Sequence, residues 1–208
     1  MEALIKTSNF LDRMITQVGK IAAWAALGMI LVTVFDVVTR NFSQSEWGFL
    51  RDLVAHQQSF FGSTQLQELE WHLHTVLFAL CLGYAYMADG HVRIDLVRER
   101  LPIRVRWWIE LIGVVFLLLP VCVLIGWFSV DFTISSLQQQ EISSSATGLT
   151  HRWIIKSFIP LGFLLLIFAG VAVLLRKLVE LFAPAELRAK VGAEASAEKV
   201  QLEKIDGG

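Results

Sequence analysis

Four long apolar stretches constrain the fold of this chain more than any other feature of its sequence. They cover residues 18–38, 73–88, 107–130 and 153–175. A helix needs about 20 residues to cross the hydrocarbon core of a bilayer. Inside that core every backbone polar group must be satisfied internally, which favours helices. The sequence therefore predicts an all-α membrane protein with four transmembrane helices.

The second and third stretches carry features that bear on how they cross. The second is too short by itself, so its helix either begins upstream, drawing in Glu68, Glu70, His72 and His74, or crosses where protein surrounds it. The third contains Pro120, which membrane helices tolerate when neighbours satisfy the freed carbonyl. We expect a kink there.

The composition supports a membrane protein and does not suggest a nucleic-acid partner. Of the 208 residues, 55% are hydrophobic and 18% are charged, whereas soluble domains carry about a quarter charged residues. The net charge of −1 gives no indication of a nucleic-acid partner. Cys81 and Cys122 lie inside apolar runs, where we expect them to pack as small hydrophobic residues.

Basic residues predict the orientation. They concentrate in the N-terminal segment, in the second loop and in the tail, and are few in the first and third loops. By the positive-inside rule, both termini and the second loop lie in the cytoplasm. The first stretch follows a mixed-polarity segment and lacks a small-residue cleavage site, so we expect a retained span rather than a signal peptide.

Three segments flank or connect the spans. Residues 1–17 alternate apolar and polar side chains at helical spacing, which predicts an amphipathic helix on the membrane surface before the chain turns inward. The first loop predicts a second amphipathic helix, on the outer surface. The resulting organisation is an N-terminal helix (1–17), a four-span domain (18–177) and a cytoplasmic tail (178–208), helical or disordered.

Charged residues at the predicted outer edge are the first candidates for function, because burying charge in a membrane is costly. Asp36 and Arg40 are four residues apart and can pair on one helix face. Glu68, Glu70 and Lys156 lie on the same predicted side. A proton or ion path would need acidic groups at the midplane, and the span centres carry none. We therefore favour mutual neutralisation that fixes helix register, with an ion path as the alternative.

Charged residues at the cytoplasmic edge indicate anchoring. Glu110 begins the third span and can pair with Arg106. In the second loop His91, Arg93 and Asp95 alternate with apolar residues, and Asp95 is placed to cap a short helix. The loop is either a capped elbow facing anionic lipid or a structured contact with a partner.

The sequence offers no signature of catalysis. It has no Gly-rich phosphate loop, nucleophile elbow or metal-ligand spacing, so we expect neither enzymatic activity nor a cofactor. All five histidines fall in loops or at span ends. A haem-b membrane anchor therefore remains only as an alternative, as does an autonomous small transporter.

A resemblance becomes apparent at residues 89–96. They resemble the G-H-V/I-R-V/I-D-L segment of the small membrane subunit (DctQ-type, or Q) of tripartite ATP-independent periplasmic (TRAP) transporters. Glu68 and Glu70-Trp71 resemble that family's E-L-x-W-x-L entry to the second span. The similarity covers residues 18–177. Further matches, in chain order, are Arg40, Glu141, Gly148-Leu149, Trp153, Lys156 and Ile159-Pro160.

The resemblance implies partners that the residues alone do not indicate. Family members work with a large membrane subunit (M), which holds the substrate and sodium sites, and with a periplasmic substrate-binding protein (P) that docks on the outer face. The small subunit braces the large one without catalysis. The implied setting is sodium-coupled uptake of an organic acid-type solute across a bacterial inner membrane, in contact with lipid and without ATP hydrolysis.

Overall fold

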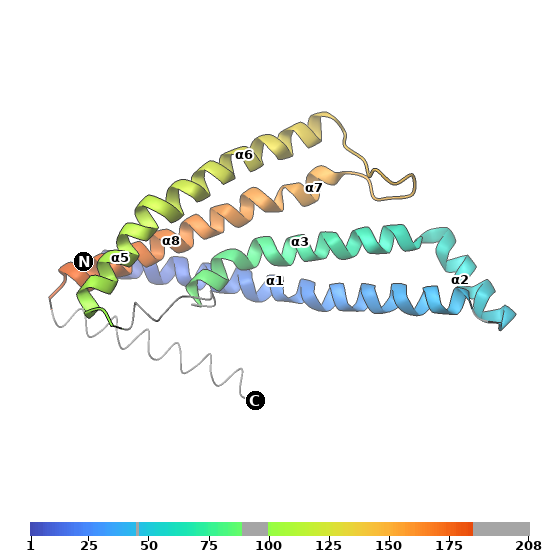
Figure 1. Cartoon of the computed structure of the whole chain (residues 1–208), viewed down its shortest axis with the longest axis horizontal. Helices are drawn as coiled ribbons and strands as arrows, with labels where there is room; N and C mark the ends of the chain where they lie inside the picture. Colours follow the sequence, from blue (N-terminus) through green and yellow to red (C-terminus); the bar gives the residue numbers. More distant parts are fainter. Residues whose placement is uncertain (45, 89–99, 185–208) are drawn as a thin grey trace.

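The computed structural model describes residues 1–44, 46–88 and 100–184, and this part of the chain is helical without strands (Figure 1). The predicted loop residues His91, Arg93 and Asp95, and most of the predicted tail, lie outside the described residues. The elements in chain order are α1 (Glu2–Ser43), α2 (Gly48–Phe60), α3 (Ser63–Met87), α5 (Ile103–Gly113), the π-helical turn η1 (Val114–Leu118), α6 (Leu119–Gln138), α7 (Arg152–Lys156) and α8 (Phe158–Phe182).

Helix α8 is the central element of the bundle. It packs against α1, α3 and α6, while α1 and α3 also pack against each other along their lengths. Figure 1 shows α2 and the connection from α6 to α7, residues 139–151, at one end of the bundle, which we call the loop end. The N-terminus and the last turns of α8 lie at the other end, which we call the terminal end.

Glycines allow α3 and α8 to approach closely. A Cβ atom added at Gly162 would lie 2.5 Å from the carbonyl oxygen of Ala79. One added at Gly83 would lie 2.9 Å from the carbonyl oxygen of Leu165. The two backbones therefore touch at both points, a packing mode that small residues make available between membrane helices.

Three helical stretches in the described part are long and apolar enough to cross a membrane: Glu2–Ser43, Ile103–Gln138 and Arg152–Phe182. They contain the first, third and fourth predicted spans. The second predicted span lies within α3, which has 25 residues but is not among the apolar stretches. As expected, its helix begins upstream at Ser63 and includes the acidic and histidine residues that precede residue 73.

The prediction that the chain turns between a surface helix (residues 1–17) and the first span is wrong. Helix α1 runs without interruption from Glu2 to Ser43. Two polar residues of its first part, Ser8 and Asp12, are buried. The Ser8 hydroxyl donates to the carbonyl of Ala172 at 2.9 Å, and Asp12 pairs with Arg176, so this part of α1 packs on α8.

The region before Pro120 has a local irregularity in place of a regular α-helix. Five residues, Val114–Leu118, form a π-helical turn between α5 and α6. Proline lacks the amide hydrogen that would continue the normal ladder, and a wider turn is one way a helix accommodates the lost bond. Figure 1 shows α5 and α6 as one bowed rod.

Candidate functional site

A glutamate of α3 ties the 139–151 loop to the bundle. The Glu68 carboxylate accepts hydrogen bonds from the Ser143 hydroxyl and, at 2.6 Å, from the Leu149 amide. The Ser143 amide in turn donates to the Leu149 carbonyl at 3.2 Å, which closes the loop on itself. We call Glu68, Ser143 and Leu149 the loop clamp.

The backbone around the loop clamp leaves no room for larger residues. A Cβ atom at Gly148 would lie 2.3 Å from the Ser143 side chain and 2.7 Å from Glu68 Oε1. Two residues with positive φ, Gln140 at 48° and His151 at 61°, bound the loop. Such φ values are uncommon outside glycine, so the turn geometry is maintained by the loop's own contacts.

Lys156 of α7 forms an ion pair with Glu141 of the same loop. Its ammonium group also lies 3.8 Å from the centroid of the Phe132 ring on α6, a cation–π contact. The hydrogen bond from Lys156 lowers the pKa of Glu141. These contacts fasten α7 to α6, and Glu141 was recognised in the sequence only through the family resemblance.

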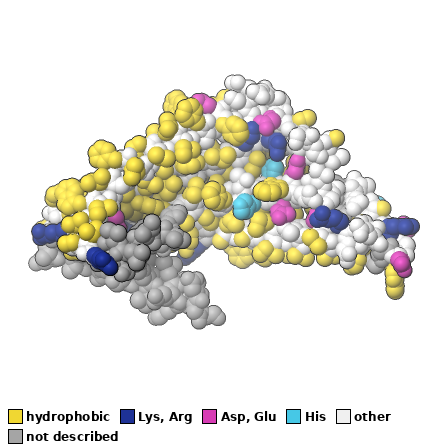
Figure 2. Space-filling model, in the orientation of Figure 1, with side chains coloured by type: hydrophobic (Ala, Val, Ile, Leu, Met, Phe, Trp, Pro, Cys, Tyr) yellow, Lys and Arg dark blue, Asp and Glu magenta, His cyan; other side chains and the backbone are white. Residues whose placement is uncertain are grey.

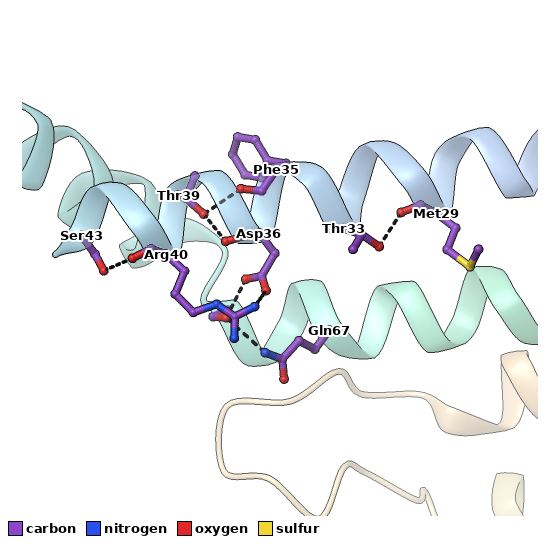
Figure 3. A network of polar contacts seen from close by, with 9 residues as sticks. Met29, Thr33, Phe35, Asp36, Thr39, Arg40, Ser43 and Gln67 are labelled. Atoms are coloured by element: carbon purple, nitrogen blue, oxygen red, sulfur yellow. Dashed lines mark hydrogen bonds and ion pairs between the residues drawn. The ribbon is translucent and has the colours of Figure 1, made fainter. Parts of the chain in front are cut away.

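The predicted pair of Asp36 and Arg40 is present at the loop end of α1. The Arg40 guanidinium lies 2.7 Å from Asp36 Oδ2, and Asp36 is only 3% exposed. The second oxygen, Oδ1, accepts a hydrogen bond from the Ser63 hydroxyl at 2.6 Å. Figure 3 shows the side chains of Asp36 and Arg40 pointing toward α3. Asp36 thus links α1 to the first turn of α3, a contact that the sequence did not predict.

The charged residues predicted for this edge do not form one cluster. Asp36 and Arg40 belong to the α1–α3 contact, Glu68 to the loop clamp, and Lys156 to the pair with Glu141. Glu70 is half-buried on α3 and takes part in none of these contacts among the described residues. Ion pairs are present for Asp36 with Arg40 and for Lys156 with Glu141, whereas the partners of Glu68 are a hydroxyl and a backbone amide.

The terminal end has its own set of ion pairs. Arg176 of α8 pairs with Asp12, which is 6% exposed, and Lys177 lies 2.9 Å from Glu110 of α5 and 2.8 Å from Glu180. The sequence anticipated Glu110 as an anchoring residue but not Lys177 as its partner. We call these contacts the terminal clamp.

A groove of about 380 Å³ opens between α3 and α8. Its lining is mostly apolar, with Phe78 and Leu82 from α3 and Ile159 and Phe163 from α8. His74 and Thr75 supply its polar atoms. Figure 2 shows histidine side chains among hydrophobic ones on the visible face of the bundle.

Within residues 1–44, 46–88 and 100–184, no group of three or more His, Cys, Asp or Glu side chains is arranged to hold a metal ion. Cys81 and Cys122 are free thiols, partly and fully buried, as the sequence predicted.

A comparison with protein families gives a match over most of the chain. The profile of the family described as "Tripartite ATP-independent periplasmic transporters, DctQ component" matches residues 29–180. The matched region includes all three residues of the loop clamp and the ion-pair partners Glu110 and Lys177. Searches of curated proteins and of solved structures found no match.

Proposed function

Because this chain belongs to the DctQ component family of tripartite ATP-independent periplasmic transporters, we propose that it is the non-catalytic small membrane subunit of such a transporter. In this role it braces a large membrane subunit, which carries the substrate and sodium sites. It binds neither substrate nor sodium itself.

The observation that carries the proposal is that charged side chains make the contacts at the two ends of the bundle. The loop clamp, the Asp36 contact and the terminal clamp join different helices at the two ends of the molecule. Between the ends the helices present broad exposed apolar faces. A frame braced at both ends suits a scaffold that stays rigid while another subunit moves.

We propose that α3 also crosses the membrane, as the second of four spans in chain order. It lies alongside α1 and α8, two helices that are themselves long and apolar enough to cross. Its 25 residues correspond to about 37 Å, which exceeds the hydrocarbon core of about 30 Å. Its polar residues are compatible with a membrane where other protein covers them.

The orientation follows from the basic residues. Both termini lie in the cytoplasm of a bacterial inner membrane, and the loop end faces the periplasm. A periplasmic substrate-binding protein then meets the complex on the side of α2 and the 139–151 loop. Coupling to sodium and an organic acid-type solute are part of this proposal and reside in the partner subunits.

The proposal is tested by co-expressing this chain with a large TRAP membrane subunit and its binding protein. We expect the two membrane subunits to co-purify, and sodium-driven uptake into liposomes to require all three proteins. Liposomes holding this chain alone provide the control and should show no flux. A chain that stays alone and stable in detergent, or that transports without the others, would contradict the proposal.

A further inference from the structure

The groove between α3 and α8 lies at a depth where an isolated protein would meet lipid tails. Ile159 and Phe163 belong to the first half of the apolar stretch 153–175, so the groove beside them lies within the span of α8. On the α3 side its rim continues as one exposed stripe. Trp71 is 70% exposed and Phe78 is 63% exposed, and His74 lies between them at helical spacing.

His74 is poorly matched to a lipid environment. Its side chain is exposed, and none of the hydrogen bonds among the described residues uses its ring. The neighbouring Thr75 hydroxyl, by contrast, donates to the Trp71 carbonyl at 2.9 Å and is satisfied. A polar ring in hydrocarbon is costly unless another protein group meets it.

Two further features of α3 also favour contact with another protein over contact with lipid. It packs lengthwise against α1 and α8, yet it is not among the helical stretches that are long and apolar enough to cross a membrane by composition. The carbonyl of Ala79 is in contact with Gly162, so the floor of the groove is backbone against backbone and cannot close further. An exposed, preformed apolar groove with one unsatisfied imidazole is a surface for a helix that offers both apolar side chains and a polar group.

We infer that this groove receives a transmembrane helix of the large membrane subunit, with apolar side chains between Phe78 and Phe163 and a hydrogen-bonding group opposite His74. The inference rests on the proposed function and deepens it, because it assigns the face through which the scaffold holds its partner. A lipid tail would fill the apolar part of the groove but would leave the imidazole unpaired.

The test uses site-specific photo-crosslinking in the co-expressed complex. Benzoylphenylalanine is introduced in place of Phe78, at the groove, and separately in place of Phe116, which is 71% exposed on the π-helical turn and serves as the matched control. We expect an adduct with the large subunit from position 78 and none from position 116. An adduct only from position 116, equal adducts from both, or a product containing two copies of this chain would overturn the inference.

The experiment separates an error in the groove assignment from an error in the proposed function. If the two membrane subunits co-purify but position 78 gives no adduct, the groove assignment is wrong and the scaffold role stands. If they do not co-purify at all, the proposed function itself fails.

The polar contact has a separate readout. We expect His74→Leu to weaken association of the two membrane subunits about tenfold, and His74→Gln to restore part of the loss because it keeps a hydrogen-bonding group. Gln17→Leu, at an exposed position of α1, is the control and should leave association unchanged. Wild-type association of His74→Leu would overturn the role of the imidazole.

Discussion

Asp12 and Asp36 show how single residues stabilise this bundle. Both carboxylates are buried, and each is paired with an arginine: Arg176 from another helix for Asp12, and Arg40 from the same helix for Asp36. A buried charge without its partner is strongly unfavourable. The Asp12–Arg176 pair joins α1 to α8, whereas Asp36 joins α1 to α3 through the Ser63 hydroxyl, and Arg40 supplies the neutralising charge.

Replacing Arg176 tests how much the ion pair with Asp12 contributes to stability at the terminal end. We expect Arg176→Ala to destabilise the protein by about 3 kcal/mol, because it leaves the Asp12 carboxylate buried and unpaired. Thermal unfolding in detergent measures the loss. Arg13→Ala, at an exposed position next to Asp12, is the control and should have little effect. Equal stability of the two variants would contradict a structural role for the pair.

Acid should loosen the 139–151 loop. The hydrogen bond from Lys156 lowers the pKa of Glu141 from its ordinary value of 4.5, so the unfolded loop takes up a proton before the folded loop does as the pH falls. The stabilisation is present above pH 4.5 and is lost as the pH falls through the folded-state pKa. Hydrogen-exchange protection of the Arg152 amide, which donates to the Glu141 carbonyl, is followed from about pH 7 to about pH 3 to measure this.

The control for the acid effect is Glu141→Gln. That variant should show weaker protection at Arg152 at neutral pH and little further loss on acidification, because the titrating carboxylate is gone. Protection in the wild-type protein that already falls between neutral and mildly acidic pH would contradict the lowered pKa.

At the scale of the elements, α3 and α8 are joined by contact between their backbones. Gly162 and Gly83 leave no space for a side chain on either side of this contact. The packing of α3 therefore depends on close approach rather than on large apolar side chains. This explains how a helix with several polar residues remains in the bundle.

Substitution at Gly162 tests the contact between these elements. We expect Gly162→Ala to cost about 2 kcal/mol, because its Cβ atom would lie 2.5 Å from the rigid Ala79 carbonyl and would force the helices apart. The change is measured as a lower unfolding temperature. Gly113→Ala, whose added Cβ atom meets nothing within 4 Å, is the matched control and should be neutral or slightly stabilising. A neutral Gly162→Ala would show that α3 and α8 can separate freely.

Local sequence predicted the contacts that lie within one helix, and it did not predict those between helices. The Asp36–Arg40 pair follows from spacing along α1 and is confirmed. The pair of Asp12 with Arg176 and that of Glu110 with Lys177 join distant segments, and spacing does not say which helices become neighbours. For the same reason the polar pattern of residues 2–17 predicted a surface helix, whereas α8 provides the partners of the buried Ser8 and Asp12.

At the scale of the whole molecule, the bundle has two chemically distinct ends. The loop end carries α2 and the clamped 139–151 loop, and the terminal end carries the N-terminus and the last turn of α8 (Figure 1). Apolar side chains cover much of the surface between them (Figure 2). The proposed orientation therefore exposes each end to a different compartment.

Cysteine labelling in intact cells tests this orientation. With the native cysteines replaced, we expect Gln140→Cys, in the exposed loop, to react with a membrane-impermeant maleimide added from the periplasmic side. Glu2→Cys, at the exposed start of α1, should react only after the inner membrane is permeabilised. The opposite pattern would reverse the proposed topology.

The two buried aspartates of α1 also define a length. A helical rise of about 1.5 Å per residue separates Asp12 from Asp36 by about 36 Å, slightly more than the hydrocarbon core of about 30 Å. The ion pairs at the two ends therefore bracket a layer close to one bilayer in thickness. Lipids with much shorter or longer chains would press one of these pairs against hydrocarbon or expose apolar helix to headgroups, so the protein carries a built-in preference for membrane thickness.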